Sequence, residues 1–109
     1  MNASISKARV LTCTCIEKSA PVVCDMAVEI YRNLIRADEC NMSDDDGRKE
    51  RQFYQREAIV GCRVLIGVLE AVRINSEIED IYKKAEEVLC MTASWKNKER
   101  KQAALRVGA

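Results

Sequence analysis

The chain has 109 residues, of which 48% are apolar and 32% charged, with one proline and four glycines, and this composition is typical of one folded domain, residues 1–109, rather than of a disordered or loop-rich chain. It has six cysteines but no histidine, which excludes Ser-His-Asp and Cys-His catalytic systems and every zinc site that needs an imidazole ligand. Lys and Arg number 18 against 17 Asp and Glu, and a net charge of +1 does not by itself indicate a nucleic-acid or membrane partner.

The N-terminal sixteen residues, MNASISKARVLTCTCI, contain no uninterrupted apolar run of the kind that forms a signal peptide. Nowhere in the chain do about eighteen apolar residues follow one another, as a membrane-spanning helix requires. We therefore expect a cytoplasmic protein without a membrane contact. In that compartment the cysteines are expected to be free thiols and buried hydrophobic residues, as the apolar surroundings of Cys62 and Cys90 indicate, and neither a metal site nor a catalytic thiol is predicted.

Residues 5–18 allow two interpretations. Ile5, Ala8, Thr12 and Cys15 recur at the spacing of one helix face, whereas the β-branched run VLTCTCI also fits a strand. A single strand would have no partner in the rest of the chain, so a helix is favoured.

A second helix is predicted to begin at Pro21, because proline is favoured in the first turn of a helix. Its apolar face consists of Val23, Met26, Ala27, Ile30, Leu34 and Ala37. The polar residues of the same stretch are expected on the opposite side of the helix, and they are Asp25, Glu29, Arg32, Asn33 and Arg36.

The stretch NMSDDDG, residues 41–47, has the composition of a loop. Ser43 and Asp46 are candidate caps for the helix that follows. The three aspartates in a row, residues 44–46, lack the ligand spacing and the closing glutamate of a calcium-binding loop, so we favour a helix cap over a cation site.

The third predicted helix runs from about Ser43 to about Ile74. Its core-facing stripe consists of Gln55, Ala58, Cys62, Leu65, Leu69 and Val72. Val60, Val64 and Gly67 lie on faces that a surface helix usually keeps polar, so we expect this helix to be buried on nearly all sides, with a second copy of the chain covering the apolar surface that the bundle leaves free. Gly61 and Gly67 each cost about 1 kcal/mol relative to alanine within a helix, which suggests a close approach of another segment there.

The fourth predicted helix begins at Ser76, which forms a capping box with Glu79. Its apolar stripe consists of Ile78, Ile81, Ala85, Val88, Thr92 and Trp95. The periodicity is lost after Trp95, and we expect a frayed helical tail over about residues 97–109. Because Trp95 occupies a core position, packing within the protein is favoured over base stacking.

Basic residues form two groups that are candidates for nucleic-acid binding. Lys49, Arg56 and Arg63 recur every seven residues on one side of the third helix, a pattern that fits either a line of phosphate contacts or an ordinary solvated face. The second group belongs to the fourth helix and its tail, where only Glu99 opposes it, and consists of Lys96, Lys98, Arg100 and Lys101.

Four helical segments with short connections predict an all-α fold, an antiparallel four-helix bundle that assembles into a homo-oligomer. The third and fourth segments also carry the strings YQREAIVGCRVLIGVLEAV and EEVLCMTASWKNKERK. Their most recognisable parts are Tyr54-Gln55 with Glu57-Ala58, the stripe through Cys62, Leu65 and Leu69, and Val88 followed seven residues later by Trp95-Lys96.

Over about residues 51–101 these features resemble the bacterial four-helix-bundle family that includes the accessory variability determinants of diversity-generating retroelements and the proteins encoded in ribosomal RNA intervening sequences. The resemblance implies a non-catalytic accessory protein without a cofactor, assembled into a ring-like homo-oligomer, commonly a pentamer. It also implies template RNA or DNA and a reverse transcriptase as partners. The alternative is a helical module for protein–protein interaction with no nucleic-acid role.

Overall fold

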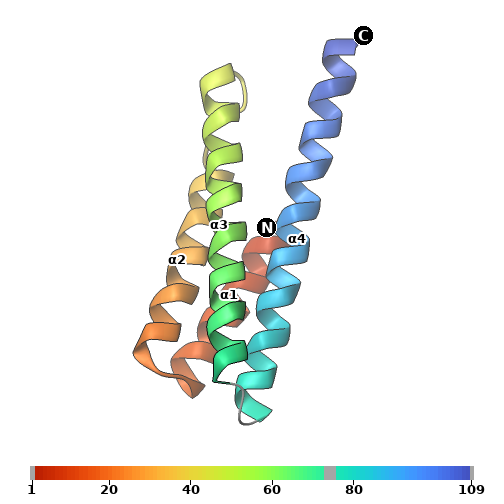
Figure 1. Cartoon of the computed structure of the whole chain (residues 1–109). Coiled ribbons are helices and arrows are strands. Elements are labelled where there is room, and N and C mark those ends of the chain that lie inside the picture. Colours follow the sequence, from red (N-terminus) through yellow and green to blue (C-terminus); the bar gives the residue numbers. More distant parts are fainter. Residues whose placement is uncertain (1, 73–75, 109) are drawn as a thin grey trace.

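The computed structural model describes residues 2–72 and 76–108, the last three of them as backbone alone. Four α-helices and no strand occur in these residues, and the helices are α1 (Ala3–Lys18), α2 (Pro21–Asp38), α3 (Asp45–Ala71) and α4 (Ser76–Gly108). Both α1 and α3 pack against α2 and α4 (Figure 1). The prediction of an all-helical chain, including a helix over residues 5–18, is confirmed.

One hydrophobic core is shared by all four helices. The predicted stripes supply it, because apolar residues three and four positions apart lie on one side of each helix. The members that are less than a tenth exposed are Ile5, Ala8, Leu11 and Cys15 from α1, Val23, Ala27, Ile30 and Leu34 from α2, Ala58, Cys62, Leu65 and Leu69 from α3, and Ile81, Ala85 and Val88 from α4. Burial of these side chains is the main contribution to the stability of the fold.

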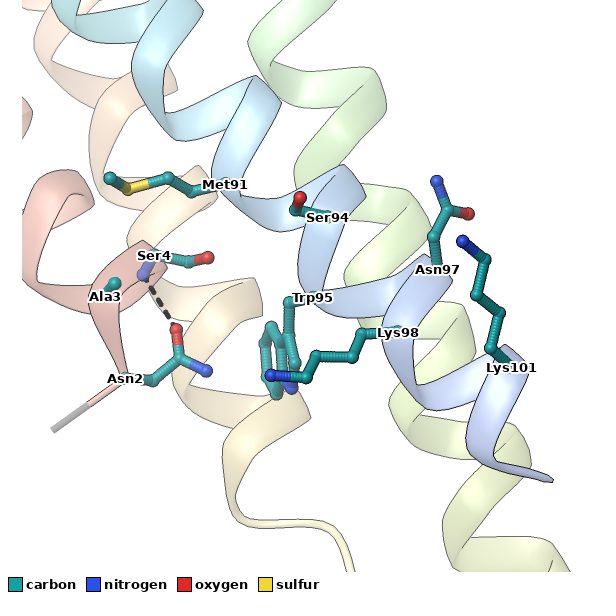
Figure 2. A pocket seen from close by; sticks show the side chains of 9 residues that line it. All are labelled: Asn2, Ala3, Ser4, Met91, Ser94, Trp95, Asn97, Lys98 and Lys101. Carbon is teal, nitrogen blue, oxygen red and sulfur yellow. Dashed lines mark hydrogen bonds between the residues drawn. The ribbon is translucent and has the colours of Figure 1, made fainter. Parts of the chain in front are cut away.

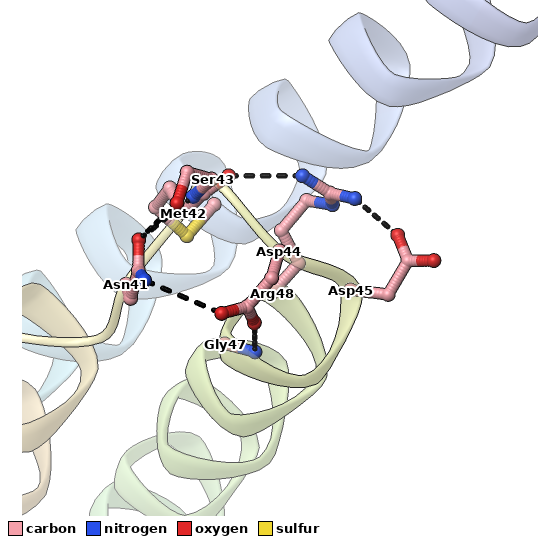
Figure 3. A network of polar contacts seen from close by, with 7 residues as sticks. All are labelled: Asn41, Met42, Ser43, Asp44, Asp45, Gly47 and Arg48. Atoms are coloured by element: carbon pink, nitrogen blue, oxygen red, sulfur yellow. Dashed lines mark hydrogen bonds and ion pairs between the residues drawn. The ribbon is translucent and has the colours of Figure 1, made fainter.

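The connection between α2 and α3 is fixed by side-chain caps (Figure 3). Asp44 caps α3, since its Oδ1 accepts a hydrogen bond of 2.6 Å from the backbone N–H of Gly47. Asn41 holds the preceding turn, where its Oδ1 accepts from the N–H of Ser43 at 3.0 Å. We expected Ser43 or Asp46 in the capping role, and the structure corrects this: α3 begins at Asp45, directly after Asp44.

The length of α4 sets the shape of the molecule. A helix of 33 residues is about 50 Å long, which matches the longest dimension of 52 Å. The helix α1 has 16 residues, and its first residues lie beside Trp95. Because α4 runs on from Trp95 to Gly108, it continues well past the start of α1 (Figure 1). That end of the molecule is therefore formed by α2, α3 and α4 without α1.

Residues 97–108 continue α4 without a break, so the tail is helical, as expected. Three other sequence expectations are wrong. Cys90 is exposed rather than buried, and Val72 is 45% exposed because it follows the last turn of α3. Asn33 is only 8% exposed, since it lies three residues after Ile30 at the edge of the buried stripe, where α3 covers it.

Within the described residues no helix combines the length and the apolar character needed to cross a bilayer. The predicted end of the third helix at Ile74 lies outside the described residues.

We predict that Gly47→Ala destabilises the fold. Gly47 is buried under the preceding loop, and a Cβ at this position would overlap the backbone carbonyl of Asn41. Relief of the overlap requires the capping turn to move, with an expected loss of about 1–3 kcal/mol in the free energy of unfolding, measured by urea titration. The exposed neighbour gives a control, because Asp46→Ala removes one favourable charge from the first turn and costs only about 0.3–1 kcal/mol.

Candidate nucleic-acid interface

Arg51 connects three helices at the end of the molecule that α1 does not cover. Its Nε and Nη2 donate to the last carbonyl groups of α2, those of Ala37 at 3.0 Å and Asp38 at 3.3 Å. Its Nη1 donates to Glu99 Oε2 of α4 at 2.5 Å. The guanidinium group also lies 5.3 Å from the centre of the Trp95 ring. Charge-assisted bonds and a cation–π contact thus hold α2, α3 and α4 together.

Glu99 has its carboxylate fully engaged in this network. One oxygen accepts from Arg51, and the other accepts from Gln55 Nε2 at 3.0 Å. The Arg51 and Glu99 side chains are only 13% and 24% exposed, so their interaction is less screened by solvent than a surface ion pair. Consequently the one acidic residue in the basic part of α4 is directed into the protein, away from its cationic neighbours.

A shallow hollow of about 200 Å³ lies on the surface between α3 and α4, and we call it the cation hollow. Its lining consists of Lys49, Gln52, Phe53, Arg56 and Lys96. The structure therefore brings two residues of the predicted third-helix line together with one from the predicted fourth-helix group. Partial burial, together with the nearby Arg100 and Arg56, lowers the pKa of Lys96, as expected for a cation among other cations.

No carboxylate pairs with these cations within the described part of the chain. The ion pairs found there use other basic residues. Three cations without an acidic partner line the cation hollow, namely Lys49, Arg56 and Lys96, and Arg100 lies close enough to Lys96 to act on its charge. Uncompensated cations gathered in one place give this surface a positive potential, which attracts anions.

The other predicted cations lie elsewhere. Lys98 and Lys101 line a different hollow of about 610 Å³, where the start of α1 meets α4 beside Trp95 (Figure 2). Positions 96 and 98 are two residues apart on a helix and so point in nearly opposite directions, which separates them. Arg63 is exposed on α3 about 10 Å further along the helix than Arg56. Of the seven predicted residues, three line the cation hollow, Arg100 lies near Lys96, and Lys98, Lys101 and Arg63 lie apart from it.

The residues predicted to contact a second copy are exposed in the single chain. Val60 is 44% and Val64 51% exposed, and Gly67 is exposed as well, with no atom within 4 Å of the place where a Cβ would be. Gly61 is different, because a Cβ there would lie 2.9 Å from Ile30 Cγ1, so packing against α2 explains this glycine.

The buried cysteines, Cys15 and Cys62, have the properties of structural residues. All six are free thiols, and burial raises the pKa of Cys62 to about 12 and that of Cys15 to about 11. A thiol with such a pKa remains protonated at neutral pH and is a poor nucleophile. Among the residues that the structure describes, no three Cys, Asp or Glu side chains come together in a way that could hold a metal ion.

Comparisons with known protein families, with curated proteins and with solved structures gave no match for this chain.

We predict that the cysteines differ strongly in reactivity. During a brief treatment of the native protein with iodoacetamide at neutral pH, the exposed Cys13 and Cys90 should be alkylated, whereas Cys15 and Cys62 should not, because they are buried and protonated. Peptide mass spectrometry locates the label, and denaturation without reductant should make all six thiols reactive. Labelling of Cys62 as fast as that of Cys90 would contradict the packing described above.

Proposed function

We propose that this chain is a non-catalytic, cytoplasmic accessory protein that binds RNA or DNA through the cation hollow and acts as a homo-oligomer. The observation that supports this proposal most directly is that Lys49, Arg56 and Lys96 line one hollow without an acidic partner, with Arg100 near Lys96. Cations held close together repel one another, so such a cluster is best explained by an anionic ligand that compensates it.

The geometry of the cluster suits a polyanionic chain better than a small anion. Lys49 and Arg56 lie two helical turns apart, about 10 Å, and Arg63 continues the line by the same distance. This separation is comparable to that of alternate phosphates on an extended strand, whereas one small anion would contact only part of the line. The residues are exposed and their contacts would be electrostatic, so binding should weaken steeply with salt.

Assembly is the second part of the proposal. We propose that the four helices form an antiparallel bundle. The start of α1 lies beside Trp95 and Lys7 pairs with Glu87 at 3.0 Å, which supports opposite directions for α1 and α4. The apolar residues Val60, Val64 and Gly67 would then be covered by another subunit. An oligomer, such as the pentameric ring that the resemblance implies, would repeat the cation hollow and add several weak phosphate contacts together.

The resemblance of residues 51–101 extends the proposal to a biological setting. Accessory proteins of diversity-generating retroelements are expected to act with a reverse transcriptase on template RNA, and we propose the same partners for this chain. A reverse-transcriptase gene beside the gene for this protein, with a repeated template region, would support this part.

A protein–protein interaction module is the second candidate function. The exposed apolar side chains of α3, which include Phe53 at 46% and Val64 at 51% exposure, favour this alternative, because they would also suit a helical partner of another sequence.

We predict that the protein binds RNA at low salt and that the triple variant Lys49→Gln, Arg56→Gln, Lys96→Gln weakens this binding. Each lost phosphate contact should remove about 0.7–0.9 from the slope of log affinity against log salt concentration. Fluorescence anisotropy with a labelled RNA measures the affinity, and circular dichroism shows whether helicity is unchanged, as expected for exposed side chains.

The matched control is the variant Arg9→Gln, Lys18→Gln, Lys83→Gln, which removes the same charge from exposed positions outside the cation hollow. This control variant should retain nearly the whole slope of log affinity against log salt concentration. Equal effects of the two variants would show that only net charge matters, and a lack of binding at low salt would favour the interaction module.

We predict further that the 12.3 kDa chain is a homo-oligomer at micromolar concentration and that Val64→Glu dissociates it. Val64 is half-exposed, so a charge there should leave the single chain folded while it disrupts an apolar contact between subunits. Size exclusion with light scattering measures the mass. Val10→Glu is the control, since Val10 is 49% exposed on α1 and lies outside the proposed interface. A wild-type protein of monomeric mass would refute the prediction.

A further inference from the structure

A second hollow, of about 430 Å³, lies beside the cation hollow between α2 and α3, and we call it the α2–α3 hollow. Phe53 lines both and forms the wall between them. The lining is apolar at Met26, Ile30 and Val60, and it includes the aromatic ring of Tyr54. Gly61 contributes depth, because α3 lies so close to Ile30 that a Cβ would touch its side chain.

Asn33 is the unusual residue of the α2–α3 hollow. It is only 8% exposed, it belongs to the lining, and its amide group has no hydrogen-bond partner among the described residues. The amide atoms still reach the solvent in the hollow, because Gln55 Oε1 is the one fully buried side-chain polar atom without a partner among the described residues. The oxygen and nitrogen of an asparagine amide can together pair with a ligand that has both a donor and an acceptor on one edge.

The aromatic side chains next to Asn33 offer a surface for stacking. The rings of Phe53 and Tyr54 lie 5.3 Å apart at an angle of 59°, and Phe53 is 46% exposed. The Arg36 guanidinium group lies 5.9 Å from the centre of the Tyr54 ring. Glu57, also in the lining, has no ion-pair partner among the described residues and could accept a hydrogen bond from a ligand amino group.

We propose that the α2–α3 hollow receives one unpaired nucleobase of a single strand whose phosphates occupy the cation hollow. This inference rests on the proposed function and refines it, because it assigns single-stranded rather than duplex nucleic acid to the site. A base is flat, has donors and acceptors on its Watson–Crick edge and is joined to a phosphate within a few ångströms, so it fits an aromatic wall, an amide without a partner in the protein and neighbouring cations together. In a duplex the same edge is already paired and the face is stacked.

An apolar segment of a second subunit is the competing occupant, since Val60 lies at the border of the hollow and belongs to the proposed subunit interface. Such a segment would leave the Asn33 amide unpaired and would place apolar surface next to Lys49, Arg56 and Lys96. A nucleotide would pair with the Asn33 amide through its base and place its phosphate next to the cations, so the chemistry of the lining favours a nucleotide.

The test compares a labelled 12-nucleotide single-stranded RNA with a blunt duplex of the same sequence, by anisotropy at low salt with the full chain. Phe53→Leu removes the ring and Asn33→Leu removes the amide at similar volume. Each should weaken single-strand binding about five- to 100-fold while the salt slope stays unchanged, because the phosphate contacts remain. Phe53→Tyr keeps the ring and should retain wild-type affinity.

Photocrosslinking with 4-thiouridine in the same RNA gives an independent readout, since a base in the hollow should crosslink to the peptide that contains residues 52–61. Circular dichroism and light scattering confirm that the variants keep their fold and assembly.

Salt-dependent RNA binding with equal affinity for the duplex, or without any effect of Phe53→Leu and Asn33→Leu, would overturn this inference and leave the proposed function intact. A lack of binding to either RNA at low salt would overturn both. Weaker single-strand binding in both variants, with the slope retained and with Phe53→Tyr unaffected, would establish the base site.

Discussion

Arg51 holds together the end of the molecule that α1 does not reach. Its guanidinium group donates hydrogen bonds to the terminal carbonyl groups of α2 and to the carboxylate of Glu99 in α4, and it lies against the Trp95 ring. A cation at the C-terminus of a helix also interacts favourably with the helix dipole. Without these contacts the second half of α4 would lack a neighbour on most sides, because α1 is too short to cover it. The position of Lys96 and Arg100 relative to α3 therefore depends on Arg51.

The same interaction explains how a chain of net charge +1 can present a strongly cationic surface. Glu99 is the acidic residue closest in sequence to Lys96 and Arg100, and both of its carboxylate oxygens are used by Arg51 and Gln55. The carboxylate that would otherwise neutralise the cluster thus serves the fold. Net charge is a sum over the whole chain, whereas a ligand responds to the potential at one place, and within a Debye length of about 8–10 Å the nearby charges dominate.

Much of the fold could be predicted from the sequence, because the helix period places core residues on one stripe independently of tertiary detail. The stripes through Ala58 and Leu65 and through Ile81 and Val88 are buried as expected. The predictions failed where a neighbouring element decides the outcome. Asn33 is buried because α3 lies over the edge of the α2 stripe, and no local pattern in α2 shows this. The cations were predicted only as two separate groups, one on each helix. The register between α3 and α4, which brings Arg56 near Lys96, cannot be read from the pattern of either helix alone.

The two ends of α3 suit different tasks. Its first half carries Lys49, Arg56 and the exposed ring of Phe53 beside the two hollows, whereas its second half exposes Val64 and the open position at Gly67. One continuous helix fixes the distance between these halves, so subunits joined through the second half would hold their cation hollows at a constant spacing. A flexible linker would spread the sites over many separations and lower their effective concentration for one strand. A rigid helix shared by the proposed interface and the proposed binding surface would thus favour several contacts on the same nucleic acid.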